Sequence, residues 1–176
     1  MATVEVDSEL KLVLVEPSFA KKYYKIVSEQ HDYLAKWLVW PPLATSEEFF
    51  LSFIEKTRLE YSQGKGMVCA MIYQGELVGN VALMNIDNDL KVGEIGYWIS
   101  QTYQGKGIIT RSVSKLIDVS FTEFDLDKIR IKACVENTPS RQVCERLNML
   151  LEGITPKNEN LHGIMVAHAV YWVQRR

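Results

Sequence analysis

Apolar residues recur along this chain at two different spacings, and each spacing is typical of one kind of secondary structure. Residues 10–15 (LKLVLV) form a short apolar run that predicts a first strand. Apolar residues then return at helical spacing in residues 17–30 and again in residues 45–61. We expect the second of these helices to start in a capping box, because Thr45 is followed three residues later by Glu48.

The middle of the chain changes to longer apolar runs. Residues 67–73 and 77–86 are separated by a Gln-Gly pair, which predicts a hairpin. Residues 92–99 add a third strand to this meander. A glycine-rich turn follows, and apolar residues at a 3.6-residue period then predict a long helix over residues 109–124.

The last third of the chain returns to a strand pattern. Residues 129–135 alternate between apolar and polar positions, and Pro139 marks the first turn of a short helix that reaches about residue 150. Residues 151–155 and 165–173 predict two final strands. The order of elements predicts a mixed α/β fold in which the unit of strand, glycine-rich turn, helix and strand holds a ligand.

Composition narrows the classes of protein. The chain has 176 residues, which suits a single domain spanning residues 1–176. The formal net charge of −2 argues against a nucleic-acid partner that would need a broad basic surface. The sequence shows neither a signal peptide nor an apolar run long enough for a membrane span. Three cysteines without a CxxC pair indicate reduced thiols in a cytoplasmic protein, and the scattered histidines predict no metal site.

The glycine-rich turn is the first candidate binding site. It comprises Gln104, Gly105, Lys106, Gly107, Ile108 and Ile109. Glycines let backbone N–H groups converge, and the start of a helix adds unpaired donors and partial positive charge, so the turn suits a phosphate or pyrophosphate. The turn matches neither the GxGxxG fingerprint nor a Walker A loop. The alternative is a tight connection that needs glycine for its backbone alone.

A second constellation follows the strand at residues 129–135. Asn137, Ser140 and Cys144 stand at helical spacing, so one helix face would present an amide, a hydroxyl and a thiol to a ligand. The alternative is a capping asparagine, a surface serine and a core cysteine. We expect neither Cys134 nor Cys144 to be a nucleophile, because no His or Asp stands at a suggestive distance in the sequence.

Several motifs, taken in order, resemble the GCN5-related N-acetyltransferases (GNAT), and within them the ribosomal-protein-serine acetyltransferases of the RimL/RimJ type. The motifs are EIGYWI at 94–99, Trp37-x-x-Trp40-Pro41, YQGKGI at 103–108, Ile131-Lys132, Asn137-x-x-Ser140, Leu151-Glu152-Gly153 and ENLHG at 159–163. The chain departs from the family pattern at Ile109, where most members have Gly or Ala, at Cys144, where many have Tyr, and at Asn148-Met149, where Gly-Phe is usual.

The resemblance implies a GNAT-type fold with a central, mostly antiparallel, twisted sheet of about seven strands and about four helices. It implies acetyl-CoA as cosubstrate and no metal. The residues expected to contact acetyl-CoA are Tyr97, Trp98, Ile99, the turn residues from Gln104 to Ile109, Asn137 and Ser140. Ser140 would protonate the leaving thiolate, and Glu159, in a polar loop before the last strand, would be the base.

The resemblance also implies acetyl transfer to the N-terminal amine of a protein, with a ribosomal protein as the partner. Two alternatives stay open: transfer to a small amine such as a polyamine, an amino acid or an antibiotic, and an acyl-CoA-binding module without turnover. Trp37, Trp40 and Glu94 would contact the acceptor, although the tryptophans could equally pack the first helices together. Glu94 is the second candidate base, Glu159 could be a solvated loop acid, and a homodimer is left open.

Overall fold

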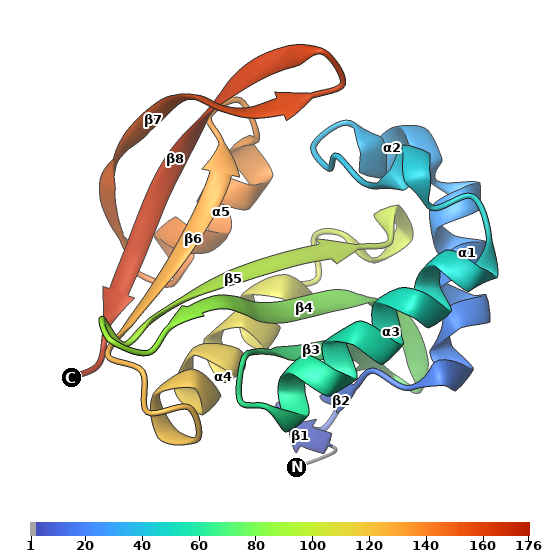
Figure 1. The fold of residues 1–176 in the computed structure, drawn as a ribbon, viewed down its shortest axis with the longest axis horizontal. Helices are drawn as coiled ribbons and strands as arrows, with labels where there is room; N and C mark the ends of the chain where they lie inside the picture. Colours follow the sequence, from blue (N-terminus) through green and yellow to red (C-terminus); the bar gives the residue numbers. More distant parts are fainter. Residues whose placement is uncertain (1–2) are drawn as a thin grey trace.

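The computed structural model describes residues 3–176, which form one eight-stranded sheet flanked by helices (Figure 1). The strand order is β1-β2-β3-β4-β5-β6-β8-β7. The strands are β1 (Thr3–Glu5), β2 (Leu10–Leu14), β3 (Met67–Tyr73), β4 (Glu76–Asp87), β5 (Val92–Ile99), β6 (Lys128–Cys134), β7 (Leu150–Leu161) and β8 (Ile164–Gln174). The α-helices are α1 (Ala20–Glu29), α2 (His31–Ala35), α3 (Glu47–Ser62), α4 (Ile108–Thr122) and α5 (Thr138–Arg146), and short 3₁₀ turns are η1 (Pro17–Phe19), η2 (Pro41–Leu43) and η3 (Gln101–Tyr103).

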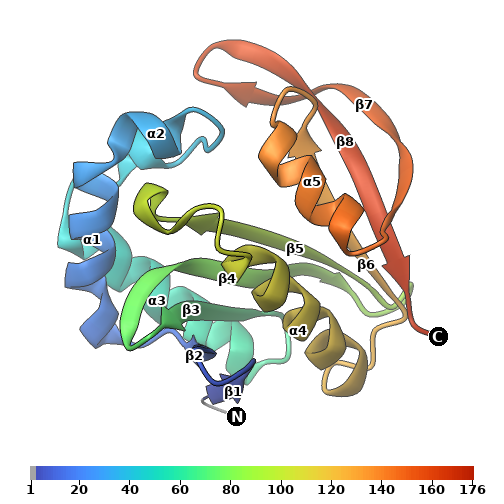
Figure 2. The same cartoon turned by 180° about the vertical axis from the view of Figure 1, so that it is seen from behind.

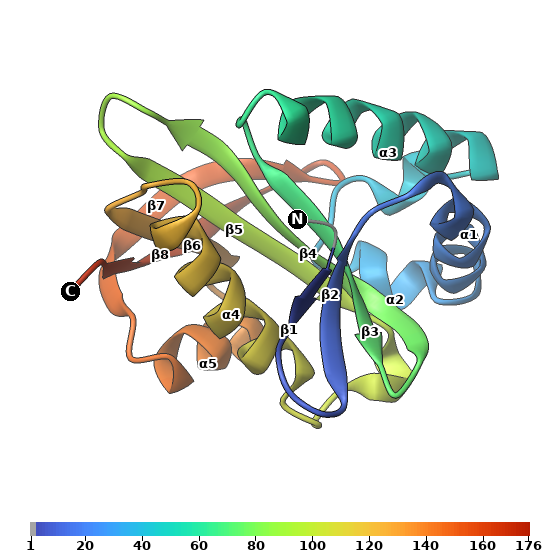
Figure 3. The same ribbon diagram turned by 90° about the horizontal axis from the view of Figure 1, so that it is seen from below.

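Helices cover both faces of the sheet. The helices α1 and α3 pack on one face, and α4 and α5 lie on the other (Figures 2 and 3). The alternation of side chains along β3 explains both layers: Cys69 and Met71 belong to the core beneath α4, whereas Val68 and Ala70 belong to the core beneath α1 and α3. Because both faces are covered, the strand reads as a continuous apolar run.

One pair of neighbouring strands departs from the antiparallel pattern. β5 and β6 are parallel, and they pair only at Val92–Lys128, Gly93–Ile129 and Glu94–Arg130. Beyond these pairs the two strands diverge (Figure 1). The second half of β5 therefore leaves the backbone groups on one edge unpaired with β6, and these groups are open to a ligand.

The predicted mixed α/β class and mostly antiparallel sheet are confirmed. The structure adds β1 and α2, which no sequence pattern marked because each is only three to five residues long. The capping box at Thr45 is wrong, because α3 starts after Ser46 and shows no side-chain cap bond.

Glu159 lies inside β7 and not in a loop, which corrects the expectation for this residue. β7 is the edge strand of the sheet and is largely exposed, so it lacks the alternation that would have marked it, and an edge position tolerates its Pro156. The short helix α5 ends at Arg146 instead of about residue 150. Asn148, which replaces the usual glycine, adopts a left-handed φ of 53°, a conformation that asparagine tolerates, and Met149 is buried.

None of the helices within residues 3–176 is both long and apolar enough to cross a membrane.

Candidate functional site

A cavity of about 280 Å³ lies where β5 and β6 diverge. Six residues named from the sequence line it: Trp37, Glu94, Tyr97, Asn137, Ser140 and Glu159. Its further lining residues are Leu38, Ile95, Gly96, Ile131, Lys132, Ala133, Cys134, Asn158 and His168. The fold therefore brings together residues that are separated by up to 131 positions in the sequence, from Trp37 to His168.

One wall of the cavity carries two hydroxyl groups in contact. The Tyr97 hydroxyl lies 3.0 Å from Ser140 Oγ and also donates to the Ser140 carbonyl at 3.2 Å. The Asn137 side chain caps α5 by accepting a hydrogen bond from the Ser140 N–H at 3.3 Å. Burial raises the pKa of Tyr97 well above its ordinary value, so its hydroxyl stays protonated at physiological pH.

Sequence reasoning used only the backbone of Tyr97 and missed its side chain. The sequence did offer one signal: position 144 lacks the usual tyrosine, so another tyrosine could have been considered in its place. Cys144 is fully buried, and burial raises the pKa of its thiol to about 12. A thiol in this state is protonated and is a weak nucleophile.

The two candidate bases have different partners. Glu94 forms an ion pair with Lys132 at 3.2 Å, close to the last paired residues of β5 and β6. Glu159 is partly exposed and lies 3.8 Å from His168 Nε2. A lysine ammonium therefore neutralises Glu94, whereas the neighbour of Glu159 is an imidazole.

The glycine-rich turn follows β5 and leads into α4. Gly105 and Gly107 adopt left-handed φ angles of 74° and 69°, and a Cβ on either glycine would meet no protein atom within 4 Å. The backbone conformation therefore requires glycine, while the space beside the turn is open to a ligand. Gly107 caps the N-terminus of α4, where N–H groups have no partner within the helix.

The guanidinium of Arg111 binds the backbone of this turn. It donates to the carbonyls of Lys106 and Gly107, both at 3.3 Å, and it pairs with Asp7 at 2.6 Å. Hydrogen bonds from Glu9 N–H and Arg111 lower the pKa of Asp7. Sequence reasoning missed Arg111, whose guanidinium links two carbonyls of the turn to Asp7.

The remaining turn residues divide between surface and core. Gln104 and Lys106 are exposed, whereas the Ile108 side chain is buried in the core beneath α4 and can offer a ligand only its backbone. Ile109 is partly buried and packs against the same core. The bulky residue at 109 is thus directed in part toward the protein interior.

The structure separates the tryptophans that the sequence grouped together. Trp37 lines the cavity, but Trp40 packs among aromatic rings, with centroids 6.3 Å from Phe49 and 5.9 Å from Trp98. Trp98 is itself buried in this cluster, and only its backbone lies along β5. Trp40 thus packs between α3 and β5, whereas the alternative from the sequence had the tryptophans pack the first helices together.

The hairpin of β7 and β8 reaches across the site toward α2 (Figure 1). At its tip, His162 Nε2 donates to the Ala35 carbonyl at 2.8 Å. This bond joins the β7–β8 hairpin to α2, two residues before Trp37 in the chain.

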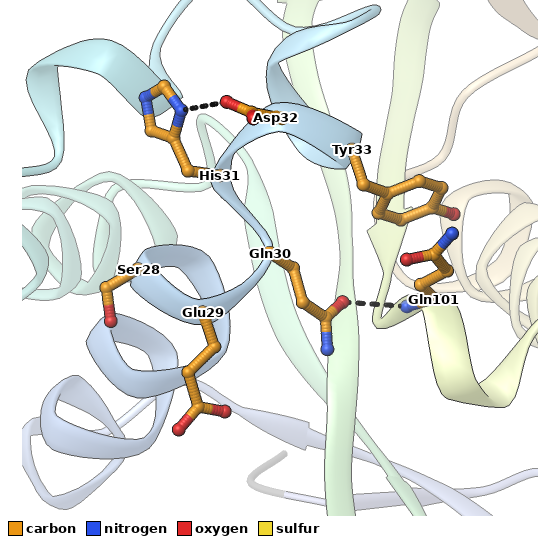
Figure 4. Close-up of a pocket in the computed structure, with 7 residues that line it drawn as sticks. All are labelled: Ser28, Glu29, Gln30, His31, Asp32, Tyr33 and Gln101. Carbon is orange, nitrogen blue, oxygen red and sulfur yellow. Dashed lines mark hydrogen bonds and ion pairs between the residues drawn. The ribbon is translucent and has the colours of Figure 1, made fainter.

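A second cavity, of about 320 Å³, lies at the junction of α1 and α2 (Figure 4). It is lined by residues 28–33 and by Gln101. Gln30 accepts a hydrogen bond from the Gln101 N–H at 2.8 Å and donates to Ser100 Oγ at 2.9 Å, so it ties this junction to the end of β5. Within residues 3–176 no three His, Cys, Asp or Glu side chains gather as a metal site.

Comparisons with known proteins agree on the family of this chain. Residues 9–150 match the family model described as Acetyltransferase (GNAT) domain. The chain is 29% identical to the ribosomal-protein-serine acetyltransferase of Escherichia coli over 160 residues, which cover 91% of this chain and 89% of that protein. It is 34% identical to the Bacillus subtilis protein YdaF over 154 residues, covering 87% and 84% of the two chains.

Among solved structures, the ribosomal L7/L12 alpha-N-protein acetyltransferase RimL in complex with coenzyme A superimposes with a TM-score of 0.94 at 26% identity. The superposition covers 98% of this chain and 97% of that one.

Proposed function

Because this chain belongs to the acetyltransferase (GNAT) family, we propose that it transfers the acetyl group of acetyl-CoA directly to the N-terminal α-amine of a protein in the cytoplasm. We further propose that the acceptor is a ribosomal protein, as in the names of its relatives. The observation that carries the proposal is the cavity between the diverging strands, which has the hydroxyls of Tyr97 and Ser140 on one wall and the carboxylate of Glu159 on another.

The residues present fit acetyl-CoA. The open space beside Gly105 and Gly107, together with the N-terminus of α4, suits a pyrophosphate, and Lys106 adds positive charge. The unpaired edge of β5 from Tyr97 to Ile99 offers backbone groups to a pantetheine arm. When bound, acetyl-CoA supplies the activated acyl group.

Glu159 removes the proton from the acceptor amine. An α-amine has a pKa near 8 against about 10.4 for lysine, so a single carboxylate is a sufficient base near neutral pH, directly or through water. The negative charge available in the cavity is limited, because Lys132 neutralises Glu94. This charge balance favours a monovalent amine over a polyamine.

Ser140 and Tyr97 return a proton to the departing thiolate. The Tyr97 hydroxyl can direct its proton to the Ser140 carbonyl or to Ser140 Oγ. As Ser140 Oγ passes its proton to the sulfur it takes one from the Tyr97 hydroxyl, which regains a proton from solvent. Neither Cys134 nor Cys144 is needed as an acyl carrier, because the amine attacks the thioester carbon itself and expels the thiolate.

The experiment is an acceptor panel with acetyl-CoA. A peptide with a free N-terminal serine and one internal lysine should gain a single acetyl group, located on the α-nitrogen by fragmentation mass spectrometry. Acetylation on lysine alone, or faster turnover of spermidine or an amino acid, would assign the small-amine activity instead. Acetyl-CoA binding without turnover of any amine would identify a binding module.

A further inference from the structure

We propose that His168 is a positioning residue that orients Glu159 toward the acceptor amine, an inference that rests on the proposed function. His168 lies on β8, is only 9% exposed and lines the same cavity as Glu159. No motif in the sequence singled it out. A buried polar ring that lines a reactive cavity needs partners, and its two nitrogens find them both on β7.

The two contacts of the ring determine where its proton lies. Asn158 Nδ2 is 2.7 Å from His168 Nδ1, and an amide nitrogen can only donate, so Nδ1 is the acceptor. The neutral imidazole therefore carries its proton on Nε2. That nitrogen lies 3.8 Å from Glu159 Oε1, so the polar N–H group stands beside the carboxylate.

An irregularity in β7 produces this arrangement. Thr155 pairs with His168 and Glu159 pairs with Val166, so β7 advances four residues while β8 advances two. Lys157, within the extra segment, has a left-handed φ of 47°. Glu159 consequently faces a residue on the same side of β8 as His168, which makes the two side chains diagonal neighbours.

The other charged groups around the cavity have partners of their own, so the role of orienting Glu159 falls to His168. The charged or titratable groups facing the cavity with it are Glu159 from β7, Lys132 and Cys134 from β6, and Glu94 and Tyr97 from β5. Lys132 is paired with Glu94, and Tyr97 is bonded to Ser140. The Nε2–H of His168 is thus positioned to favour one orientation of the Glu159 carboxylate.

The test compares His168→Leu with His168→Gln, because glutamine can place an amide donor near the former Nε2. Both are assayed from pH 5.5 to 9.5 with acetyl-CoA and the N-terminal serine peptide, or with whichever amine of the panel the wild type acetylates. His168→Leu should lower kcat/KM about tenfold at pH 7 and by less toward pH 9, where the α-amine deprotonates unaided, while the KM for acetyl-CoA stays unchanged. His168→Gln should recover most of the rate.

Three further variants complete the test. Asn158→Ala, at an exposed position, should reproduce part of the loss without threatening the fold. In a Glu159→Gln background, His168→Leu should cost little more, because the residue acts through Glu159. His31→Leu is the matched control, since His31 is exposed and stands 3.2 Å from the Asp32 carboxylate, away from the cavity between β5 and β6.

A loss that stays the same from pH 7 to pH 9, equal losses for the Leu and Gln variants, or losses that multiply in the double variant would each overturn the role of His168 while leaving the proposed function intact. A wild type that acetylates no amine would overturn both.

Discussion

The hydroxyl of Tyr97 lies 3.0 Å from Oγ of Ser140, although 43 residues separate them in the sequence. This contact bridges β5 and α5, the helix that follows β6. Many members of the family have a tyrosine at position 144, where this chain has Cys144. The hydroxyl of Tyr97 provides a phenol close to that position. We therefore expect proton donation to depend on the pair.

Ser140→Ala should lower kcat by ~10²-fold with little change in acetyl-CoA affinity, because it removes the group that protonates the thiolate. Tyr97→Phe should lower kcat by a smaller factor, about tenfold, since the serine keeps its own proton. Cys144→Ala should be mild, because its thiol is buried, does not line the cavity and meets the pair through a hydrogen bond with Tyr97. Steady-state kinetics with the serine peptide gives the ranking, and a larger loss for Cys144→Ala than for Ser140→Ala would contradict it.

Gly107→Glu should abolish acetyl-CoA binding measured by calorimetry. The substitution places a side chain and a negative charge in the open space that suits the pyrophosphate. Gly64→Glu is the matched control, because Gly64 has the same φ of 69° and equally open surroundings but lies after α3, outside the turn. Both variants should lose about 1 kcal/mol of stability to the left-handed backbone, and only the first should lose binding. Tight binding by Gly107→Glu would place the coenzyme elsewhere.

Glu159→Gln should lose most of the activity at pH 7 and recover part of it toward pH 9. The reason is the acceptor: an α-amine with a pKa near 8 is mostly protonated at pH 7 and deprotonates unaided at higher pH. Rates for the N-terminal serine peptide across this range measure the effect. Glu94→Gln provides the comparison, and the same recovery in that variant with none in Glu159→Gln would assign the base to Glu94.

Trp40→Ala should lower the stability of the protein, whereas Trp37→Ala should weaken binding of the peptide. Trp40 packs against Phe49 and Trp98, so its removal should cost about 3 kcal/mol in urea unfolding. Trp37 lines the cavity and is only partly buried, so its removal should raise the KM for the peptide with a small change in stability. A loss of stability in Trp37→Ala together with a raised KM in Trp40→Ala would contradict this assignment.

The family resemblance, drawn from short motifs in their order, is confirmed by the match over residues 9–150. Local chemistry explains why the sequence determined so much. β3 and β5 begin and end where their apolar runs predicted, because their side chains face covered layers of the core. The glycine turn was readable because the positive φ angles of Gly105 and Gly107 select glycine whatever the rest of the fold does.

Contacts set by strand register were beyond the reach of the sequence. The Tyr97–Ser140 pair depends on how β5 and β6 diverge after three paired residues. The approach of Glu159 to His168 depends on the two extra residues in β7, an exposed edge strand with no alternation to mark it. Local patterns indicate which face of an element is buried. The partner of a side chain across the sheet is decided only when the strands pair. The tertiary structure alone therefore brought Tyr97 to Ser140 and Glu159 to His168.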